Sequence, residues 1–164
     1  MKKHVILSIF GALLCLCLNA QEPDVFQQAE RQCPTVPTGL LRAIAFTNTQ
    51  CHHLTDADYT FPADDPAAMP RAYGMMGLVR DGKGWFRENL KTVSELSGLA
   101  EEALLESPAA NVTGYAMAFE KLAAQMGIRS DKAEDYLPVI EALSVSTRTT
   151  TPSPGHSRSK TAKM

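Results

Sequence analysis

The segment at residues 108–126 constrains the fold of this chain more than any other part of the sequence. Its apolar residues recur at intervals of three and four, the spacing that places side chains on one side of an α-helix. These residues are Val112, Tyr115, Ala116, Phe119, Leu122, Ala123 and Met126. Ser107 followed by Pro108 suits the start of a helix, and Gly127 suits its end. A long amphipathic helix of this kind needs other apolar surfaces to cover it.

Five other segments have a helical pattern and can supply those surfaces. They are residues 23–32, 39–50, 85–97, 100–105 and 132–144. We expect Asp24 to cap the first of them, Thr38 to cap the second and Gly98 to end the third. Pro138 would kink the last helix unless that helix starts near Leu137. No segment alternates in the manner of a strand, so the sequence predicts an all-α domain of five or six helices.

The predicted helix at residues 39–50 carries an amide at the end of an apolar side. That side is formed by Leu40, Leu41, Ile44 and Ala45. Asn48 falls on the same side one turn later. We therefore expect a core helix that delivers the Asn48 side chain to the edge of a groove. The irregular connection that follows, at residues 51–71, has a length that is often functional.

The first 20 residues have the pattern of a secretory signal peptide. A short basic start precedes an apolar run at residues 5–18, and Ala20 is suited to cleavage. The run is short for a membrane span, which makes retention as an uncleaved anchor the less favoured alternative. Export predicts a secreted or periplasmic protein with one domain at residues 21–144. Residues 145–164 are mainly Ser, Thr, Pro and basic residues, a composition that predicts a disordered tail or linker.

The charges are unevenly distributed along the chain. All 18 acidic groups fall within residues 21–144, whereas two of the 16 basic groups lie in the leader and four in the tail. The predicted domain is therefore acidic and the predicted tail is basic. An acidic surface is unfavourable for nucleic acid, so DNA and RNA are not expected partners, whereas a neutral glycan is compatible with it. After signal cleavage the sequence predicts no membrane contact.

Two cysteines, Cys33 and Cys51, flank the helix at residues 39–50. Export permits a disulfide, but a helix of about 11 residues is about 16 Å long, whereas bridged Cα atoms lie about 5.5 Å apart. The sequence thus leaves a disulfide and two separate thiols equally open. His52 and His53 follow Cys51, but adjacent residues rarely bind one ion together and no second spaced pair is present. We predict neither a metal nor another cofactor.

Three segments of the chain resemble one protein family. They are AFTNT at residues 45–49, YGMMGL at residues 73–78 and FRENL at residues 86–90. Together they are similar to the lysozyme-like N-terminal region of secreted bacterial N-acetylmuramoyl-L-alanine amidases, and less closely to the lysozyme-like domain of soluble lytic transglycosylases. The resemblance covers roughly residues 37–143. It implies a small lysozyme-like helical domain that is related to the peptidoglycan of the cell wall.

The chain departs from the transglycosylase pattern at the position that carries catalysis. The family has a glutamate there that protonates the glycosidic oxygen, whereas this chain has Asn48. An amide donates no proton at a useful pH, so a general-acid contribution of roughly 10²–10⁴ in rate is missing. Gly77 likewise stands where the family has a glutamine. The candidates for a substitute acid are the loop residues Asp56 and Asp58 and, on the helix predicted at residues 85–97, Glu88.

The resemblance also implies a glycan-binding groove around Asn48. The side chains expected to line it are Asn48, Tyr73, Met75, Met76 and Tyr115, with core packing at least as good an interpretation for Met76 and Tyr115. The first interpretation of the chain is a catalytically silent module that binds peptidoglycan glycan strands or positions a separate amidase domain. The alternatives are an active glycosidase or lytic transglycosylase that uses another acid, and a non-catalytic interaction domain.

Overall fold

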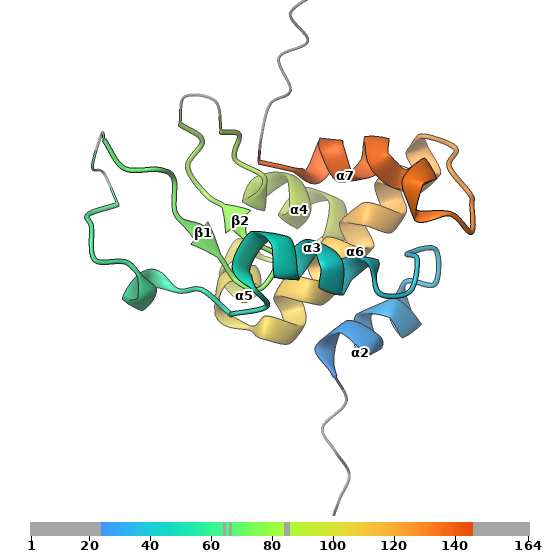
Figure 1. Cartoon of the computed structure of the whole chain (residues 1–164), viewed down its shortest axis with the longest axis horizontal. Coiled ribbons are helices and arrows are strands. Elements are labelled where there is room, and N and C mark those ends of the chain that lie inside the picture. The colour runs from blue at the N-terminus through green and yellow to red at the C-terminus, as the bar shows by residue number, and fades with distance from the viewer. Residues whose placement is uncertain (1–23, 64, 66, 84–85, 146–164) are drawn as a thin grey trace, which may run out of the picture.

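The computed structural model describes residues 24–63, 65, 67–83 and 86–145, and this part of the chain is mostly helical (Figure 1). The α-helices are α2 (Val25–Gln32), α3 (Leu40–Thr49), α4 (Leu90–Ser97), α5 (Glu101–Glu106), α6 (Pro108–Gln125) and α7 (Leu137–Leu143). Two 3₁₀ turns, η2 (Asp56–Asp58) and η3 (Ala133–Tyr136), and a hairpin of β1 (Ala72–Tyr73) and β2 (Leu78–Val79) complete it. The predicted signal peptide, and the predicted tail after Val145, lie outside the described residues.

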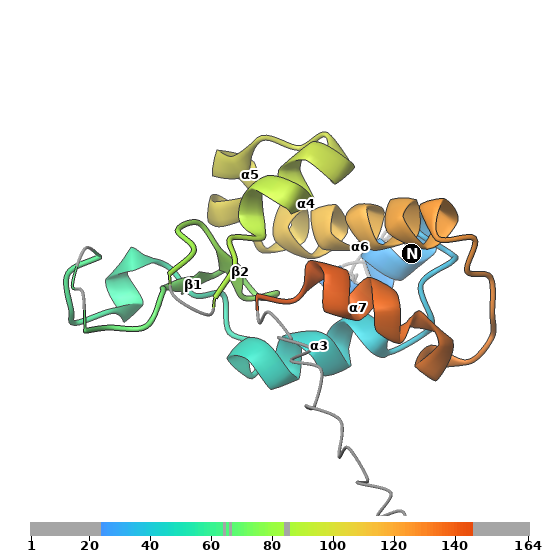
Figure 2. The ribbon, with the colours of Figure 1, turned by 90° about the horizontal axis from the view of Figure 1, so that it is seen from above.

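Helix α6 is the centre of the fold, as its apolar pattern predicts. Figure 2 shows α4 and α5 on one side of α6 and α7 and α3 on the other. Its fully buried side chains include Val112 and Phe119, and the hydroxyl of Ser107 accepts a hydrogen bond from the Ala110 amide at 3.2 Å. The predicted start of this helix is confirmed. Because α6 contacts several helices at once, it fixes the positions of the others.

The predicted boundaries of α2, α4 and α7 are confirmed where a cap or a proline defines them. Asp24 accepts a hydrogen bond from the Phe26 amide at 3.1 Å, and Gly98 ends α4 in the left-handed conformation. Helix α7 begins at Leu137, so Pro138 lies in its first turn, where no amide donor is missed. The start of α3 differs from the prediction, because Gly39 rather than Thr38 occupies the N-cap position.

The expectation that the chain has no strand is wrong. β1 and β2 pair antiparallel, with Ala72 opposite Val79 and Tyr73 opposite Leu78. Each strand has only two residues, which is too short to produce an alternating pattern in the sequence. The hairpin lies at one end of the helical body, beyond the C-terminal end of α3 (Figures 1 and 2).

The predicted helix at residues 85–97 is also wrong at residues 86–89, because α4 begins only at Leu90, and Trp85 lies outside the described residues. Residues 86–89 are non-helical, and we call them the 86–89 segment. The Phe86 amide donates to Lys83 O, the Arg87 amide donates to Val145 O, and the Asn89 amide donates to Val79 O. The bonds of Arg87 and Asn89 reach residues outside the segment and replace the local hydrogen bonds that these amides would form in a helix. Glu88 is therefore exposed in an irregular segment and not on a helix.

No helix within residues 24–63, 65, 67–83 and 86–145 combines the length and the apolar character needed to cross a lipid bilayer.

Candidate functional site

A cavity of about 360 Å³ lies beside the C-terminal half of α3. Its lining comes from α3, the 86–89 segment, α6 and the end of α7. The lining residues are Ala43, Ile44, Thr47, Asn48, Asn89, Tyr115, Ile140, Leu143, Ser144 and Val145. We call this space the Asn48 cavity. Its described lining is mainly apolar, with two amides, and it contains no acidic or basic side chain.

Asn48 is exposed in the last turn of α3, as the helical pattern predicts. Its Nδ2 donates a hydrogen bond to the backbone carbonyl of Met76 at 2.9 Å. No residue that the structure describes donates to its Oδ1. The amide therefore has two roles: one half fastens the hairpin turn to α3, and the other half is available as an acceptor beside the cavity.

The turn between β1 and β2 is held against α3 and α6 by backbone contacts that need glycine. Gly74 and Gly77 both adopt positive φ, of 67° and 68°. A Cβ atom on Gly77 would lie 2.9 Å from the Cβ of Asn48, and one on Gly74 would lie 2.0 Å from Nδ2 of Asn111. The absence of a side chain at Gly77 thus has a steric reason, because α3 approaches the turn closely.

Asn111 is a central polar residue that the sequence analysis missed. It is fully buried on α6, accepts a hydrogen bond from the Met76 amide and donates one to Leu104 O, both at 2.8 Å. The sequence does indicate that Asn111 is buried, because Asn111 precedes Tyr115 by one helical turn and so lies on the apolar side of the helix. The hydrogen bonds of Thr49, whose hydroxyl lies 2.6 Å from Met75 O, complete the attachment of the turn.

Asn89 is a second missed residue, and it lines the Asn48 cavity directly. Its Oδ1 accepts from the Val79 amide and its Nδ2 donates to Leu143 O, both at 2.8 Å. The side chain is 4% exposed. Asn89 therefore joins the hairpin to the end of α7 and fixes the width of the cavity between α3 and α7.

Of the five predicted glycan-binding residues, the structure brings Asn48 and Tyr115 together in this cavity. Tyr115 is 2% exposed, and burial raises the pKa of its hydroxyl well above the usual range. Tyr115 therefore stays neutral and can only act as a neutral hydrogen-bonding group or an apolar wall.

The other three predicted glycan-binding residues do not line the Asn48 cavity. Met76 is fully buried in the core, and its carbonyl group accepts the hydrogen bond from Asn48. Met75 is partly buried against the core, and its carbonyl group accepts the hydrogen bond from Thr49. Tyr73 lines two other cavities, of about 410 and 120 Å³.

Asp56 is held as an anion on η2. The hydroxyl of Tyr73 donates to its Oδ1 at 2.8 Å, and Nη1 of Arg71 lies 2.7 Å from the same atom. These contacts, that of Tyr73 first, hold the pKa of Asp56 below its usual value. A general acid needs the opposite shift, because it must carry its proton near neutral pH.

Asp58 and Glu88 are no better placed for acid catalysis. Asp58 accepts hydrogen bonds from the amide and the hydroxyl of Thr55, at 2.7 and 2.9 Å, which lower its pKa. Asp58 and Glu88 are exposed, and neither lines the Asn48 cavity. Asp56 lines the separate cavity of about 410 Å³.

Cys33 and Cys51 are both free thiols in the structure. Cys33 is buried at the end of α2, where desolvation and the Glu120 carboxylate raise its pKa to about 11. Among the residues that the structure describes, no three His, Cys, Asp or Glu side chains lie close enough together to hold a metal ion.

Comparisons with family models, with curated proteins and with solved structures find no match for this chain. The geometry around Asn48 therefore carries the functional argument.

Proposed function

We propose that this chain is an exported, lysozyme-like module that binds peptidoglycan glycan strands at the Asn48 cavity without cleaving them. The observation that carries the proposal is the lining of this cavity, which has amides and apolar side chains and no carboxyl group. A glycosidase of the two-carboxylate type needs an acid at the scissile oxygen. An amide at that place can hold a sugar but cannot protonate it.

The polar half of the cavity suits an acetamido group. The free Oδ1 of Asn48 can accept a hydrogen bond from the N–H of an N-acetylated sugar, while its Nδ2 stays bound to Met76 O. Ile44, Ile140 and Leu143 offer apolar contacts to the acetyl methyl group and to the C–H face of the ring. A small number of polar groups in a mainly apolar cavity is typical of ligand sites.

The resemblance to the amidase N-terminal region extends this proposal to a partner. A module that holds the glycan strand would keep an attached or separate amidase domain close to its substrate by raising the local concentration. The zinc chemistry of amide cleavage would belong to that other domain. The chain described here would contribute binding alone.

The test mixes residues 21–164 with purified insoluble peptidoglycan and analyses both the pellet and the supernatant. We expect protein in the pellet and no soluble muropeptides. Ala43→Trp, on the exposed lining of the Asn48 cavity, should abolish pelleting by filling the space. Ala124→Trp, an equally large change at an exposed alanine of α6, is the matched control and should leave pelleting unchanged.

The two other outcomes separate the alternative functions. Soluble fragments in the supernatant would contradict a silent module and would direct attention to Asp56, Asp58 and Glu88. Failure of the folded protein to pellet would overturn glycan binding and leave an interaction domain.

A further inference from the structure

The chain leaves the described part of the structure at the edge of the Asn48 cavity. Ser144 and Val145, which follow α7, both contribute to the lining of this cavity. Their backbone is held in place, because the Arg87 side chain donates to Ser144 O at 3.0 Å and the Arg87 amide donates to Val145 O at 2.7 Å. Residues 146–164, which we call the tail, therefore start beside the cavity.

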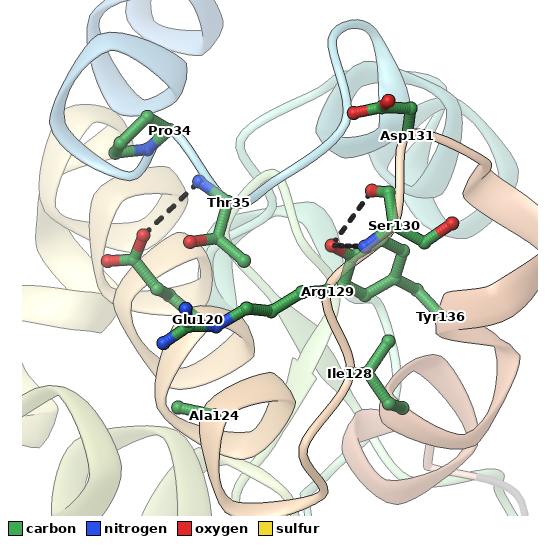
Figure 3. Close-up of a pocket in the computed structure, with 9 residues that line it drawn as sticks. All are labelled: Pro34, Thr35, Glu120, Ala124, Ile128, Arg129, Ser130, Asp131 and Tyr136. Carbon is green, nitrogen blue, oxygen red and sulfur yellow. Dashed lines mark hydrogen bonds between the residues drawn. The ribbon is translucent and has the colours of Figure 1, made fainter.

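A second cavity, of about 500 Å³, lies at the C-terminal end of α6 (Figure 3). Its lining carries charged side chains, among them Glu120, whose carboxylate accepts a hydrogen bond from the Thr35 amide at 3.2 Å. Neither Ser144 nor Val145 contributes to this lining. Of the two cavities, the Asn48 cavity is thus the one that the start of the tail adjoins.

The Asn48 cavity restricts the chemistry of whatever fills it. The half-buried side chains of Ile44 and Ile140 offer apolar contacts, and Oδ1 of Asn48 accepts a hydrogen bond from no residue that the structure describes. The described lining has no charged side chain that could pair with a charge on an occupant, and an unpaired charge is costly to bury. A suitable occupant therefore has an apolar group beside a neutral hydrogen-bond donor.

The start of the tail has this chemistry. Residues 146–151 read Ser-Thr-Arg-Thr-Thr-Thr. A threonine side chain carries a methyl group and a hydroxyl donor on one carbon, and an acetamido group likewise offers a methyl group and an N–H donor. In an extended segment Thr147, Thr149 and Thr151 would point to one side and Arg148 to the other, so the charge of Arg148 would stay in water.

The tail needs little affinity to occupy the cavity, because it is tethered at the cavity edge. Thr147 follows Val145 by two residues and Thr151 follows it by six, which at about 3.3 Å per residue gives a reach of roughly 7–20 Å. A short tether gives an effective concentration in the millimolar range. A dissociation constant of about 1 mM for the untethered segment would therefore be enough for substantial occupancy.

We propose that residues 147–151 dock in the Asn48 cavity through their threonine side chains and compete there with the glycan strand. The tail thereby covers the apolar lining until a glycan displaces it. The competition rests on the proposed function of the cavity, whereas the docking of the tail does not.

The first test detects the docked tail by NMR in the protein of residues 21–164. We expect nuclear Overhauser effects between the methyl groups of the tail threonines and those of Ile44 and Ile140. Ala43→Trp, which fills the cavity, should abolish these effects. Ala124→Trp, on α6 and outside the cavity lining, should preserve them.

Two triple variants assign the contacts to the start of the tail. Replacing Thr147, Thr149 and Thr151 by glycine should abolish the effects and shift the methyl signals of the two isoleucines. The matched control removes three hydroxyl groups from the later part of the tail and should leave the spectra of the cavity unchanged. It replaces Ser153, Ser157 and Ser159 by glycine.

The second test measures the competition by pelleting the same proteins with increasing amounts of insoluble peptidoglycan. The threonine variant should bind with an affinity at least about threefold higher than the unchanged chain, because a larger fraction of its cavities is available to the glycan. The serine variant should have the affinity of the unchanged chain.

The outcomes separate this proposal from the proposed function. Absence of tail contacts in the unchanged chain, or unchanged isoleucine signals in the threonine variant, would overturn the docking. Tail contacts together with equal affinity of all three proteins for peptidoglycan would overturn the competition. Tail contacts without pelleting of any of these proteins would support the docking and overturn glycan binding.

Discussion

The amide of Asn48 is tied to the hairpin as well as directed at the cavity. Because its Nδ2 donates to Met76 O at 2.9 Å, an acid at this position would place an oxygen against a carbonyl oxygen. The last turn of a helix also disfavours negative charge. The identity of this residue therefore affects the stability of the turn in addition to the chemistry of the cavity.

We predict that Asn48→Asp destabilises the protein by about 1–2 kcal/mol at pH 7, since a hydrogen bond is replaced by a repulsion. The folded-state pKa of the introduced carboxyl is raised above its unfolded value of about 3.9, because only the protonated form can donate to Met76 O. The deficit is therefore smallest below that unfolded pKa and grows as the pH rises through the folded pKa. Urea unfolding at pH 3.5 and at pH 7 measures it.

Asn48→Ala is the control for this prediction, because it removes the hydrogen bond without adding a titrating group. Its deficit should be the same at both pH values. An equal deficit of Asn48→Asp at pH 3.5 and pH 7 would show that the Met76 carbonyl does not face the side chain.

At the scale of elements, Asn111 of α6 accepts a hydrogen bond from the Met76 amide of the hairpin turn and lies close to Gly74. We predict that Asn111→Ala costs about 2–4 kcal/mol, because it leaves the Met76 amide and Leu104 O without partners. Gly74→Ala should be similarly severe, because its methyl group would overlap the Asn111 amide and the backbone has positive φ.

The double variant Gly74→Ala with Asn111→Ala tests whether the stability loss of Gly74→Ala comes from steric overlap with Asn111. With Asn111→Ala present, the atoms that the new methyl group would meet are gone. The double variant should therefore lose clearly less stability than the two single variants added together, as measured by urea unfolding. Simple additivity would argue against the close approach of the turn to α6.

The sequence predicted the helices well, because apolar spacing, Asp24, Ser107 and Gly98 are local signals. It missed the hairpin, since two-residue strands have no periodicity, and it placed the start of α4 too early. The 86–89 segment is not helical because the amides of Asn89 and Arg87 bond to Val79 and Val145, which lie outside the segment in the sequence. Such partners cannot be read from local pattern.

The candidate site was predicted only in part for the same reason. The helical pattern placed Asn48 correctly at the end of α3, and Tyr115 lies beside it in the cavity. Tyr73 lies outside the Asn48 cavity, and its hydroxyl donates a hydrogen bond to Asp56. Asn89 lines the cavity because its hydrogen bonds to the hairpin and to α7 hold it there. These positions depend on tertiary contacts between elements.

At the scale of the whole molecule, the reactivity of the Cys33 thiol measures whether α2 remains packed on α6. We predict that a thiol reagent at pH 8 modifies half-buried Cys51 in the native protein and modifies Cys33 only on unfolding. Burial prevents access to Cys33, and a pKa of about 11 leaves little reactive thiolate. Peptide mass spectrometry after labelling with and without urea measures both sites.

A disulfide between the two cysteines would leave neither reactive, even in urea, until a reductant is added. Rapid labelling of Cys33 without urea would instead show that the end of α2 opens in the native state.

The C-terminal end of α7 is held by hydrogen bonds from residues that lie much earlier in the sequence. Arg87 donates from its backbone to Val145 O at 2.7 Å and from its side chain to the Glu141 and Ser144 carbonyls, and Asn89 donates to Leu143 O. During synthesis the 86–89 segment therefore waits for its partners until residue 145 has emerged from the ribosome. The wall of the Asn48 cavity between the 86–89 segment and α7 is therefore completed only after α7 has been synthesised.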